Sequence, residues 1–288
     1  MTFLLADPAP TEAPRDSGDL LVGMPHLALN GLSETWLLKE CGHRHWMMLA
    51  RELGQPVPDF RDRTGATVYA TFTAVSTADA ALDQVEENDR LRFEGRIERV
   101  SRTQFQSTQR IAVGERTVAR VTLLSVFLKR AQAGDNRSVV RAVPSRMPLA
   151  LFEPGAGQGL AGTAYGFRDG SWGEHMGFRR EERRILASHP IDPCPHGDFN
   201  GAGFLYFASF QGFADRAEWA FHRDRSARLT TARRELFLYG NVNPGDRLTV
   251  NLCGLREGGE ALDHWLEIVR QSDGSRIADV LSLRRGPE

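Results

Sequence analysis

The chain has 288 residues, with 36 lysines and arginines against 37 aspartates and glutamates, so its formal net charge is −1. This balance argues against a dedicated nucleic-acid-binding protein, because such proteins carry a net basic face. Hydrophobic residues make up 41% of the chain and charged residues 25%, which is typical of a soluble globular protein. No apolar run approaches the ~20 residues that cross a bilayer. The length allows one large domain or two small ones.

The cysteines and the first residues bear on where the protein works. Three isolated cysteines, without a Cys-x-x-Cys pair, predict no disulfide framework and a reducing cytoplasm. Residues 1–18 lack the basic and apolar regions of a signal peptide, so we interpret them as a disordered tail. One stretch collects candidate metal ligands, but their spacing matches no standard zinc site and we expect no metal: His189, Cys194, His196 and Asp198.

The first half of the chain predicts one long helix followed by strands. After a short apolar run at 20–22, apolar residues recur near a period of 3.6 from Leu32 to Leu53. Ser33 can cap this helix, and Gly54 with Pro56 can end it. Four segments rich in β-branched and aromatic residues follow, and we expect them to pair as antiparallel strands: 67–75, 91–101, 103–113 and 117–129.

The second half repeats this order. Residues 130–172 lack periodicity and are rich in glycine and proline, so we interpret them as a connection. A second apolar helix is expected to open at Asp198-Phe199-Asn200-Gly201 and to end near Trp219. Strand-like segments follow at 234–241, 247–255, 261–270 and 276–283. The sequence thus divides into an N-terminal unit at 19–150 and a connecting segment with a C-terminal unit at 151–288.

A long apolar helix packed along a curved antiparallel sheet is the hotdog arrangement, so two copies predict an α+β double hotdog with sheets paired edge to edge. Each helix start leaves unpaired N–H groups and a partial positive charge, which polarise a thioester carbonyl. Gly31 and Gly201 would let a substrate approach the backbone. We call each helix start, with the loop before it, a helix mouth. His26, Asn30 and Ser33 cluster at the first mouth, and because this mouth has more polar side chains than the second, we favour it as the active site.

Several motifs in both halves resemble a family of double-hotdog biosynthetic proteins, the one typified by the leinamycin-pathway bifunctional methylmalonyl-CoA acyltransferase/decarboxylase. The resemblance spans roughly residues 20 to 283. It rests on these segments, in order: Gly23-Met24-Pro25-His26-Leu27, Asn30-Gly31-Leu32-Ser33-Glu34, His45-Trp46, Asp198-Phe199-Asn200-Gly201, Leu205-Tyr206-Phe207-Ala208-Ser209-Phe210 and Asp215-Arg216-Ala217-Glu218.

The resemblance implies decarboxylation of methylmalonyl-CoA without a cofactor and delivery of the propionyl group to an acyl carrier protein. It also implies a tyrosine acyl acceptor, for which the strand context indicates Tyr69. We therefore expect four catalytic residues, namely Tyr69, His26, Asn30 and Ser33. The substrate-binding positions would be Gly31, Leu32, Asn200 and Asp198. The partners would be an acyl-CoA and a carrier protein, with no nucleic acid or membrane, and the fold is compatible with a homodimer.

Two other functions fit the same sequence. An acyl-thioester hydrolase would use an acid such as Asp198, and a hydratase would pair a histidine with an acid, for which His26 and Glu34 are candidates. The other function, besides these two thioester enzymes, is that of a non-catalytic acyl-thioester binding module. The arginines between 179 and 184 are expected on a solvated helix face, with CoA phosphates or an acidic carrier protein as the alternative role.

Overall fold

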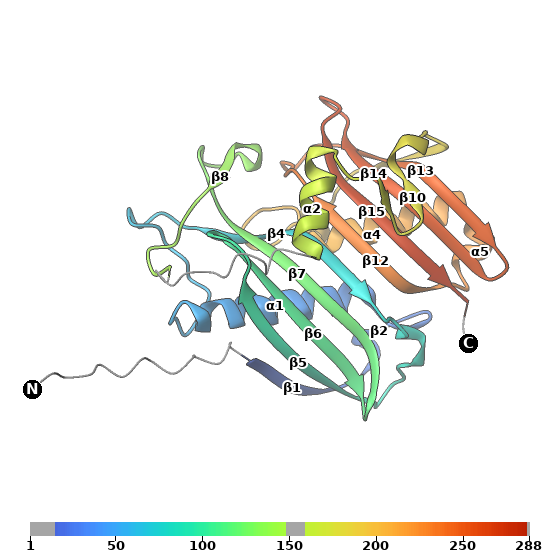
Figure 1. Ribbon diagram of the computed structural model, residues 1–288, viewed down its shortest axis with the longest axis horizontal. Helices are drawn as coiled ribbons and strands as arrows, with labels where there is room; N and C mark the ends of the chain where they lie inside the picture. Colours follow the sequence, from blue (N-terminus) through green and yellow to red (C-terminus); the bar gives the residue numbers. More distant parts are fainter. Residues whose placement is uncertain (1–14, 148–158, 287–288) are drawn as a thin grey trace, which may run out of the picture.

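A computed structural model describes residues 15–147 and 159–286. Its centre is an antiparallel sheet of eleven strands in the order β1-β5-β6-β7-β4-β12-β15-β14-β13-β11, with β8 paired to β7 (Figure 1). The first five strands of this order come from the N-terminal half of the chain and the last five from the C-terminal half. Each half is therefore a continuous part of the sheet.

In the N-terminal half, a buried helix precedes the main run of strands. Helix α1 spans Glu34–Glu52, and the Ser33 hydroxyl accepts a hydrogen bond from the Trp36 N–H at its start, as predicted. The strands are β1 (Arg15–Leu21), β2 (Leu27–Ala28), β3 (Gly31–Leu32), β4 (Tyr69–Ala78), β5 (Arg90–Arg99), β6 (Gln104–Val113), β7 (Arg116–Arg130) and β8 (Val139–Arg141). Short 3-10 turns are η1 (Met24–His26), η2 (Leu82–Gln84) and η3 (Asn136–Ser138). The four strands predicted after the helix are confirmed to within three residues.

The C-terminal half repeats the arrangement with more connections. Its helices are α2 (Leu160–Asp169), α3 (Pro195–Asp198), α4 (Phe207–Phe221) and α5 (Arg223–Ser226), with a 3-10 turn η4 (Arg180–Glu182). Its strands are β9 (Glu174–His175), β10 (Phe178–Arg179), β11 (Ala187–Ile191), β12 (Thr230–Leu238), β13 (Leu248–Gly258), β14 (Ala261–Arg270) and β15 (Arg276–Arg285). The predicted repeat of a helix followed by four strands is therefore confirmed.

Three boundaries differ from the sequence prediction. Strand β1 begins at Arg15, inside the stretch assigned to the tail, because residues 15–21 pair with β5. The second long helix begins at Phe207 rather than near Asp198, because Phe199 forms a bridge with Leu205 and closes a loop first. The run 179–184 forms a strand end and a 3-10 turn rather than a helix face. Part of the predicted connection, 148–158, lies outside the described residues.

The two halves join where β4 and β12 pair in the middle of the sheet. The pairing covers only four residue pairs, from Arg234 opposite Thr77 to Phe237 opposite Ala74. Beyond Ala74 and Phe237 the strands are no longer paired, so β4 residues 69–73 and residues 238–241 diverge. This divergence opens a gap between the halves at one end of the seam.

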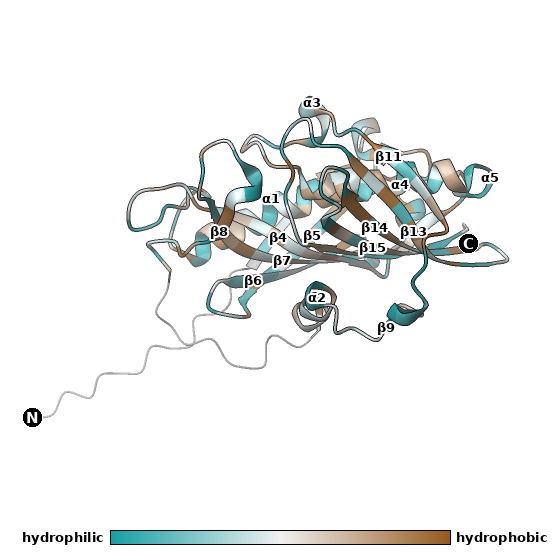
Figure 2. Ribbon diagram, turned by 90° about the horizontal axis from the view of Figure 1, so that it is seen from above, coloured by the Kyte–Doolittle hydropathy of each residue, from teal (hydrophilic) through white to brown (hydrophobic). Residues whose placement is uncertain are grey.

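Helices cover both faces of the sheet. Helices α1 and α4 lie on one face and α2 lies on the other, against β4, β7 and β12 (Figure 2). The core between the sheet and α1 and α4 is mostly aliphatic and phenylalanine-rich. The core under α2 stacks three aromatic rings, Trp172, Phe167 and Phe237, at centroid distances of 4.3 and 4.1 Å. Each face of the seam is therefore covered by a different helix.

Candidate functional site at the start of α4

The two long helices run antiparallel, which decides what each helix start faces. Near the start of α1 the Thr35 hydroxyl donates to Gln211 Oε1 of α4 at 2.5 Å. Near its end, the Trp46 ring stacks on Tyr206 at 6.3 Å. Trp46 lies 13 residues after Ser33, about 20 Å along the helix at roughly 1.5 Å per residue. The two helix mouths are therefore separate places with different surroundings.

At the α1 mouth, the predicted polar residues make contacts within the protein. His26 Nδ1 accepts a hydrogen bond from the Gly23 N–H at 2.8 Å, and its ring packs edge-on against Trp36 at 4.7 Å. The Asn30 amide donates to the Ala227 carbonyl at 2.9 Å. Ser33 caps the helix. These three side chains thus serve local structure in this conformation.

Gly31 and Leu32 are packed as well. Gly31 has a positive φ of 85°, and a Cβ there would lie 2.1 Å from the Leu82 carbonyl oxygen of η2. The space beside Gly31 that was expected to admit substrate therefore holds protein backbone. Leu32 is 2% exposed and belongs to the core.

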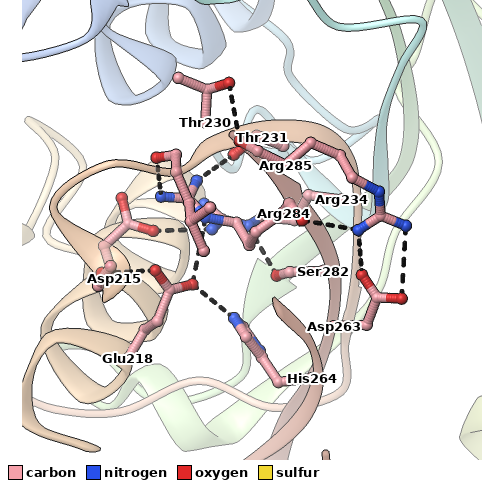
Figure 3. Close-up of polar contacts among 12 residues, drawn as sticks. Asp215, Glu218, Thr230, Thr231, Arg234, Asp263, His264, Ser282, Arg284 and Arg285 are labelled. Carbon is pink, nitrogen blue, oxygen red and sulfur yellow. Dashed lines mark hydrogen bonds and ion pairs between the residues drawn. The ribbon is translucent and has the colours of Figure 1, made fainter. Parts of the chain in front are cut away.

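A buried ionic network fills the region behind the α1 mouth (Figure 3). The Glu34 carboxylate accepts hydrogen bonds from the Thr231 hydroxyl at 2.7 Å and from Arg234 at 2.9 Å. Arg234, which is completely buried, also donates to Asp215 at 2.7 Å and to Ser282 at 2.9 Å. Burial raises the pKa of Glu34, although the charge of Arg234 acts in the opposite direction. Arg234 thus provides the counter-ion for the Glu34 carboxylate, which would otherwise be a buried charge without a partner.

A histidine–acid pair does exist here, but it is not formed by His26 and Glu34, the candidates for a hydratase. His264 Nε2 lies 2.7 Å from Glu218 Oε2, and both side chains are at most 2% exposed. The guanidinium of Arg284 lies 3.2 Å from the same carboxylate oxygen. Burial alone would raise the pKa of Glu218, but the hydrogen bond to His264 and the charge of Arg284 outweigh it and hold the pKa below its usual range. The pair is sequestered from substrate.

A cavity of about 890 Å³ lies at the start of α4 instead. This volume is within the range of roughly 300–1,000 Å³ for small-molecule sites. Its wall combines β4, the loop before α4, Lys39 and Trp46 of α1, and the residues after β12. Most of the lining is apolar and aromatic, including Trp46, Phe60, Phe72, Phe204, Phe207 and Phe210. Of the predicted site residues, the lining contains Tyr69, Asn200 and Gly201.

Tyr69 is held at the cavity wall by an arginine. Arg130, the last residue of β7, donates to the Tyr69 phenolic oxygen at 3.2 Å. The same guanidinium donates to Asn136 Oδ1 at 2.7 and 2.9 Å and to the Ala202 carbonyl at 2.6 Å. It also lies over the Phe204 ring, 3.9 Å from the centroid. Arg130 therefore fixes Tyr69 relative to the loop that precedes α4.

Asn200 and Gly201 form that loop. Asn200 Oδ1 accepts hydrogen bonds from the N–H groups of Ala202 at 3.0 Å and Phe204 at 3.1 Å. Its amide nitrogen makes no hydrogen bond within the described part of the chain and is free for a ligand. A Cβ on Gly201 would meet no atom within 4 Å. Unlike Gly31, this glycine has open space beside it.

Asp198 lies beside the cavity but not in its lining. Its carboxylate accepts a hydrogen bond from the Cys194 N–H at 2.8 Å and lies 3.6 Å from Arg216. The hydrogen bond to Cys194 thus joins the two ends of the short helix α3. The backbone carbonyl of Asp198 accepts a hydrogen bond from the N–H of Tyr206, a residue of the cavity lining, at 2.7 Å.

The charges around the cavity have one sign. The charged residues in its described lining are Lys39, Arg141 and Arg168, with no aspartate or glutamate among them. No side chain caps the first turn of α4, so its partial positive charge adds to theirs. The described residues contain no group of three or more His, Cys, Asp or Glu side chains that could hold a metal ion. The cavity is therefore suited to an anionic or anion-forming ligand.

Sequence reasoning missed Arg130, Lys39, Arg141 and Arg168. Arg130 had a usable signal, because the predicted strand 117–129 ends beside it and Tyr69 pairs with Leu128 across the β4–β7 ladder. The other three come from three separate elements, so no local motif connects them.

None of the described helices combines the length and apolarity needed to cross a membrane.

Comparisons with known proteins agree with this fold. No family model and no curated protein sequence matches the chain. Among solved structures, an acyl-ACP thioesterase from Bacteroides thetaiotaomicron matches with a TM-score of 0.60 and 10% identity, covering 94% of this chain and 98% of that one. The 12:0-ACP thioesterase from Umbellularia californica matches with 0.62 and 9%, covering 96% and 99%. A putative oleoyl thioesterase from Lactobacillus plantarum matches with 0.64 and 11%, covering 96% and 98%.

These matches extend over nearly the whole of each chain. The protein is thus a double-hotdog protein of the α+β class, as its sequence predicted.

Proposed function

We propose that the protein acts on an acyl thioester at the α4 mouth, decarboxylating a malonyl-type CoA thioester and passing the acyl group to an acyl carrier protein. The observation that carries this proposal is the Tyr69–Arg130 pair at the wall of a cavity whose described lining contains no carboxylate. Loss of CO₂ needs no general base. It needs an electron sink at the thioester carbonyl and a carboxylate withdrawn from water.

In the first step the carbon–carbon bond to the carboxylate breaks. CO₂ leaves, and the electron pair forms the thioester enolate. The enolate oxygen would lie at the uncapped first turn of α4 and beside the free amide of Asn200, where backbone N–H groups and the helix dipole stabilise negative charge. The apolar rings of Phe204 and Phe207 favour the loss of the charged carboxylate.

In the second step Tyr69 serves as proton donor and then as acyl acceptor. Its phenolic proton moves to the enolate carbon, which gives the propionyl thioester and a phenolate. The Arg130 guanidinium, already donating to that oxygen, neutralises the phenolate. The phenolate attacks the thioester carbon and CoA leaves as the thiolate. The thiol of the carrier protein then attacks the tyrosyl ester, and its proton passes to the departing phenolate, which restores the Tyr69 hydroxyl for the next turnover.

The second candidate function is thioester hydrolysis, which is favoured because the three matched solved structures with this fold are thioesterases by name. A hydrolase that uses a carboxylate base would need one at the cavity. Asp198 is the nearest candidate named from the sequence, and its carboxylate is bound to the Cys194 N–H. Decarboxylation, in contrast, needs no carboxylate base at the cavity.

Product analysis separates the two functions. The protein is incubated with methylmalonyl-CoA and with propionyl-CoA, each with and without a carrier protein carrying phosphopantetheine, and the products are followed by mass spectrometry. The proposal predicts CO₂ and propionyl carrier protein from methylmalonyl-CoA. Free methylmalonate or propionate with free CoA, independent of the carrier, would establish the hydrolase instead.

Two tyrosine variants refine the test. Tyr69→Phe keeps the ring but removes the acceptor oxygen, so the propionyl carrier product should be lost. Tyr206→Phe is the matched control, because Tyr206 lines the same cavity without contacting Arg130. Undiminished propionyl transfer by Tyr69→Phe would rule out the tyrosyl ester.

A further inference from the structure

The cavity at the α4 mouth extends through the sheet. Its lining includes Phe207 and Phe210 of α4 and, from the opposite face, Tyr165 and Arg168 of α2. Helices α2 and α4 lie on opposite faces of the sheet (Figure 2). The passage between the faces lies where β4 and β12 stop pairing after Phe237. The site thus has a second end, under α2, that the proposed chemistry does not use.

Two guanidiniums flank a tyrosine ring at this second end. The guanidinium carbons of Arg168 and Arg276 lie 5.6 and 4.6 Å from the Tyr239 ring centroid. The Tyr239 hydroxyl donates to the buried Asp279 carboxylate at 2.6 Å, which fixes the ring. Arg276 has Asp279 as its counter-ion at 3.4 Å. Arg168 instead donates to two backbone carbonyls, Leu238 and Tyr239, and is paired with no carboxylate of the described chain.

Arg141 of β8 adds a second cation without a counter-ion. It is exposed, lines the cavity, and makes no side-chain hydrogen bond or ion pair within residues 15–147 and 159–286. Its charge lies near enough to Arg168 to act on it: partial burial lowers the pKa of Arg168, and the charges of Arg141 and Arg276 lower it further. Unpaired like charges held close together favour binding of an anion.

We propose that Arg141 and Arg168 bind the phosphate ester at the far end of the substrate's pantetheine arm, which enters under α2 and reaches the α4 mouth through the gap between β4 and β12. This inference rests on the proposed function, because it takes a pantetheine thioester as the ligand. Guanidinium groups suit phosphate oxygens, which they bind through two parallel N–H groups. The phosphate has two sources, CoA and the phosphopantetheine of a carrier protein.

Equilibrium binding of unreactive ligands tests the inference without any catalytic step. The full chain is titrated with CoA, dephospho-CoA, 4′-phosphopantetheine and pantetheine by calorimetry. Arg141→Glu is the main variant, because its side chain has no partner in the described structure to lose. Arg90→Glu is the matched control, because Arg90 lies exposed on β5 outside the cavity lining and makes no side-chain hydrogen bond or ion pair with the described residues. Arg168→Ala is a second variant. Thermal unfolding gives its folded fraction, and its binding is compared with that of the wild type at the same concentration of folded protein.

We expect Arg141→Glu and Arg168→Ala each to weaken CoA binding by about tenfold, the effect of one charge-assisted hydrogen bond. Pantetheine binding should be unchanged, and Arg90→Glu should behave like the wild type. Equal weakening for 4′-phosphopantetheine would assign the arginines to the phosphate shared with the carrier protein. A loss confined to CoA would assign them to its nucleotide phosphates and would overturn the inference.

Three further results would overturn the inference. They are unchanged CoA binding in both variants, equal loss of pantetheine binding, and equal loss in the Arg90→Glu control. These outcomes differ from the case in which the protein does not take pantetheine thioesters at all, because the wild-type protein would then bind none of the four ligands.

Discussion

The contrast between Gly31 and Gly201 yields a quantitative prediction about the two helix mouths. At Gly31 an added methyl group would lie 2.1 Å from the Leu82 carbonyl oxygen and 2.7 Å from the Asp83 Cα, on a residue with φ of 85°. At Gly201 the same methyl group would meet no atom within 4 Å. The two Gly→Ala substitutions are therefore chemically identical but should differ in their consequences.

The magnitudes follow from strain and overlap. A left-handed backbone costs alanine about 1–2 kcal/mol, and displacing η2 to relieve the overlap adds about 1–3 kcal/mol, the usual cost of overpacking. Gly31→Ala should thus destabilise the fold by about 2–5 kcal/mol. For a chain of this size that lowers the melting temperature by at least about 4 °C, at roughly 2 °C or more per kcal/mol.

Thermal unfolding and enzyme kinetics together test this difference. Gly201→Ala should leave the melting temperature within about 1 °C of the wild type, the range for substitutions that disturb no packing. It should raise KM for the acyl thioester, because the methyl group enters the cavity. An unchanged melting temperature in Gly31→Ala, or a KM effect confined to that variant, would refute the assignment of the open mouth to α4.

Three further predictions address the polar groups. Arg234→Met should lower the free energy of unfolding by about 3–5 kcal/mol, because it leaves Glu34 buried without its cation; adding Glu34→Gln should recover part of this loss in urea titrations. Burial raises the pKa of Asp279 to about 6, so the folded state binds more protons than the unfolded state between about pH 4 and 6. The contribution of Asp279 to the free energy of unfolding therefore falls as the pH rises through that window. This fall amounts to about 3 kcal/mol, and Asp279→Asn should remove it. Arg130→Lys keeps one charge but cannot hold Tyr69, Asn136 and the loop together, so acyl transfer should fall at least tenfold while CoA binding, measured by calorimetry, persists.

Local patterns predicted most of the fold because the elements carry them in full. The α1 helix shows a 3.6-residue apolar period, a serine cap and a terminating glycine, and each feature appears in the structure. Along most of their length, β5 alternates buried with exposed residues and β6 alternates buried with half-buried residues, which their composition indicated. The pairing of the two halves could be predicted from the double-hotdog arrangement, because two sheets gain stability when their edge strands pair.

The start of α4 was misplaced because two Asn-Gly pairs looked equivalent. Asn30-Gly31 lies three residues before α1 begins, whereas Asn200-Gly201 lies six residues before α4. The bridges Leu27–Leu32 and Phe199–Leu205 are the corresponding features, and the second encloses one residue more. Bridges of this kind join residues across a turn and leave no periodic signal.

The favoured helix mouth could not be decided from the sequence because both mouths are built from both halves. Glu34 and Arg234 are 200 residues apart, so the ion pair behind the α1 mouth was invisible as a motif. Tyr69 was named from its strand context, yet its partner Arg130 comes from another strand and its neighbours Asn200 and Phe204 from the other half. The pairing of β4 with β7 and the packing of the loop before α4 against these strands bring the residues together.

The central claim is that catalysis occurs at the α4 mouth, and a complex with an unreactive substrate tests it most directly. The ligand is a methylmalonyl-CoA analogue whose thioester sulfur is replaced by methylene, and the measurement is a crystal structure of the complex. We predict that the ketone oxygen lies beside Asn200 and the first turn of α4, with Tyr69 within reach of the acyl carbon. An acyl group bound beside Asn30 and Ser33 at the α1 mouth would contradict the account.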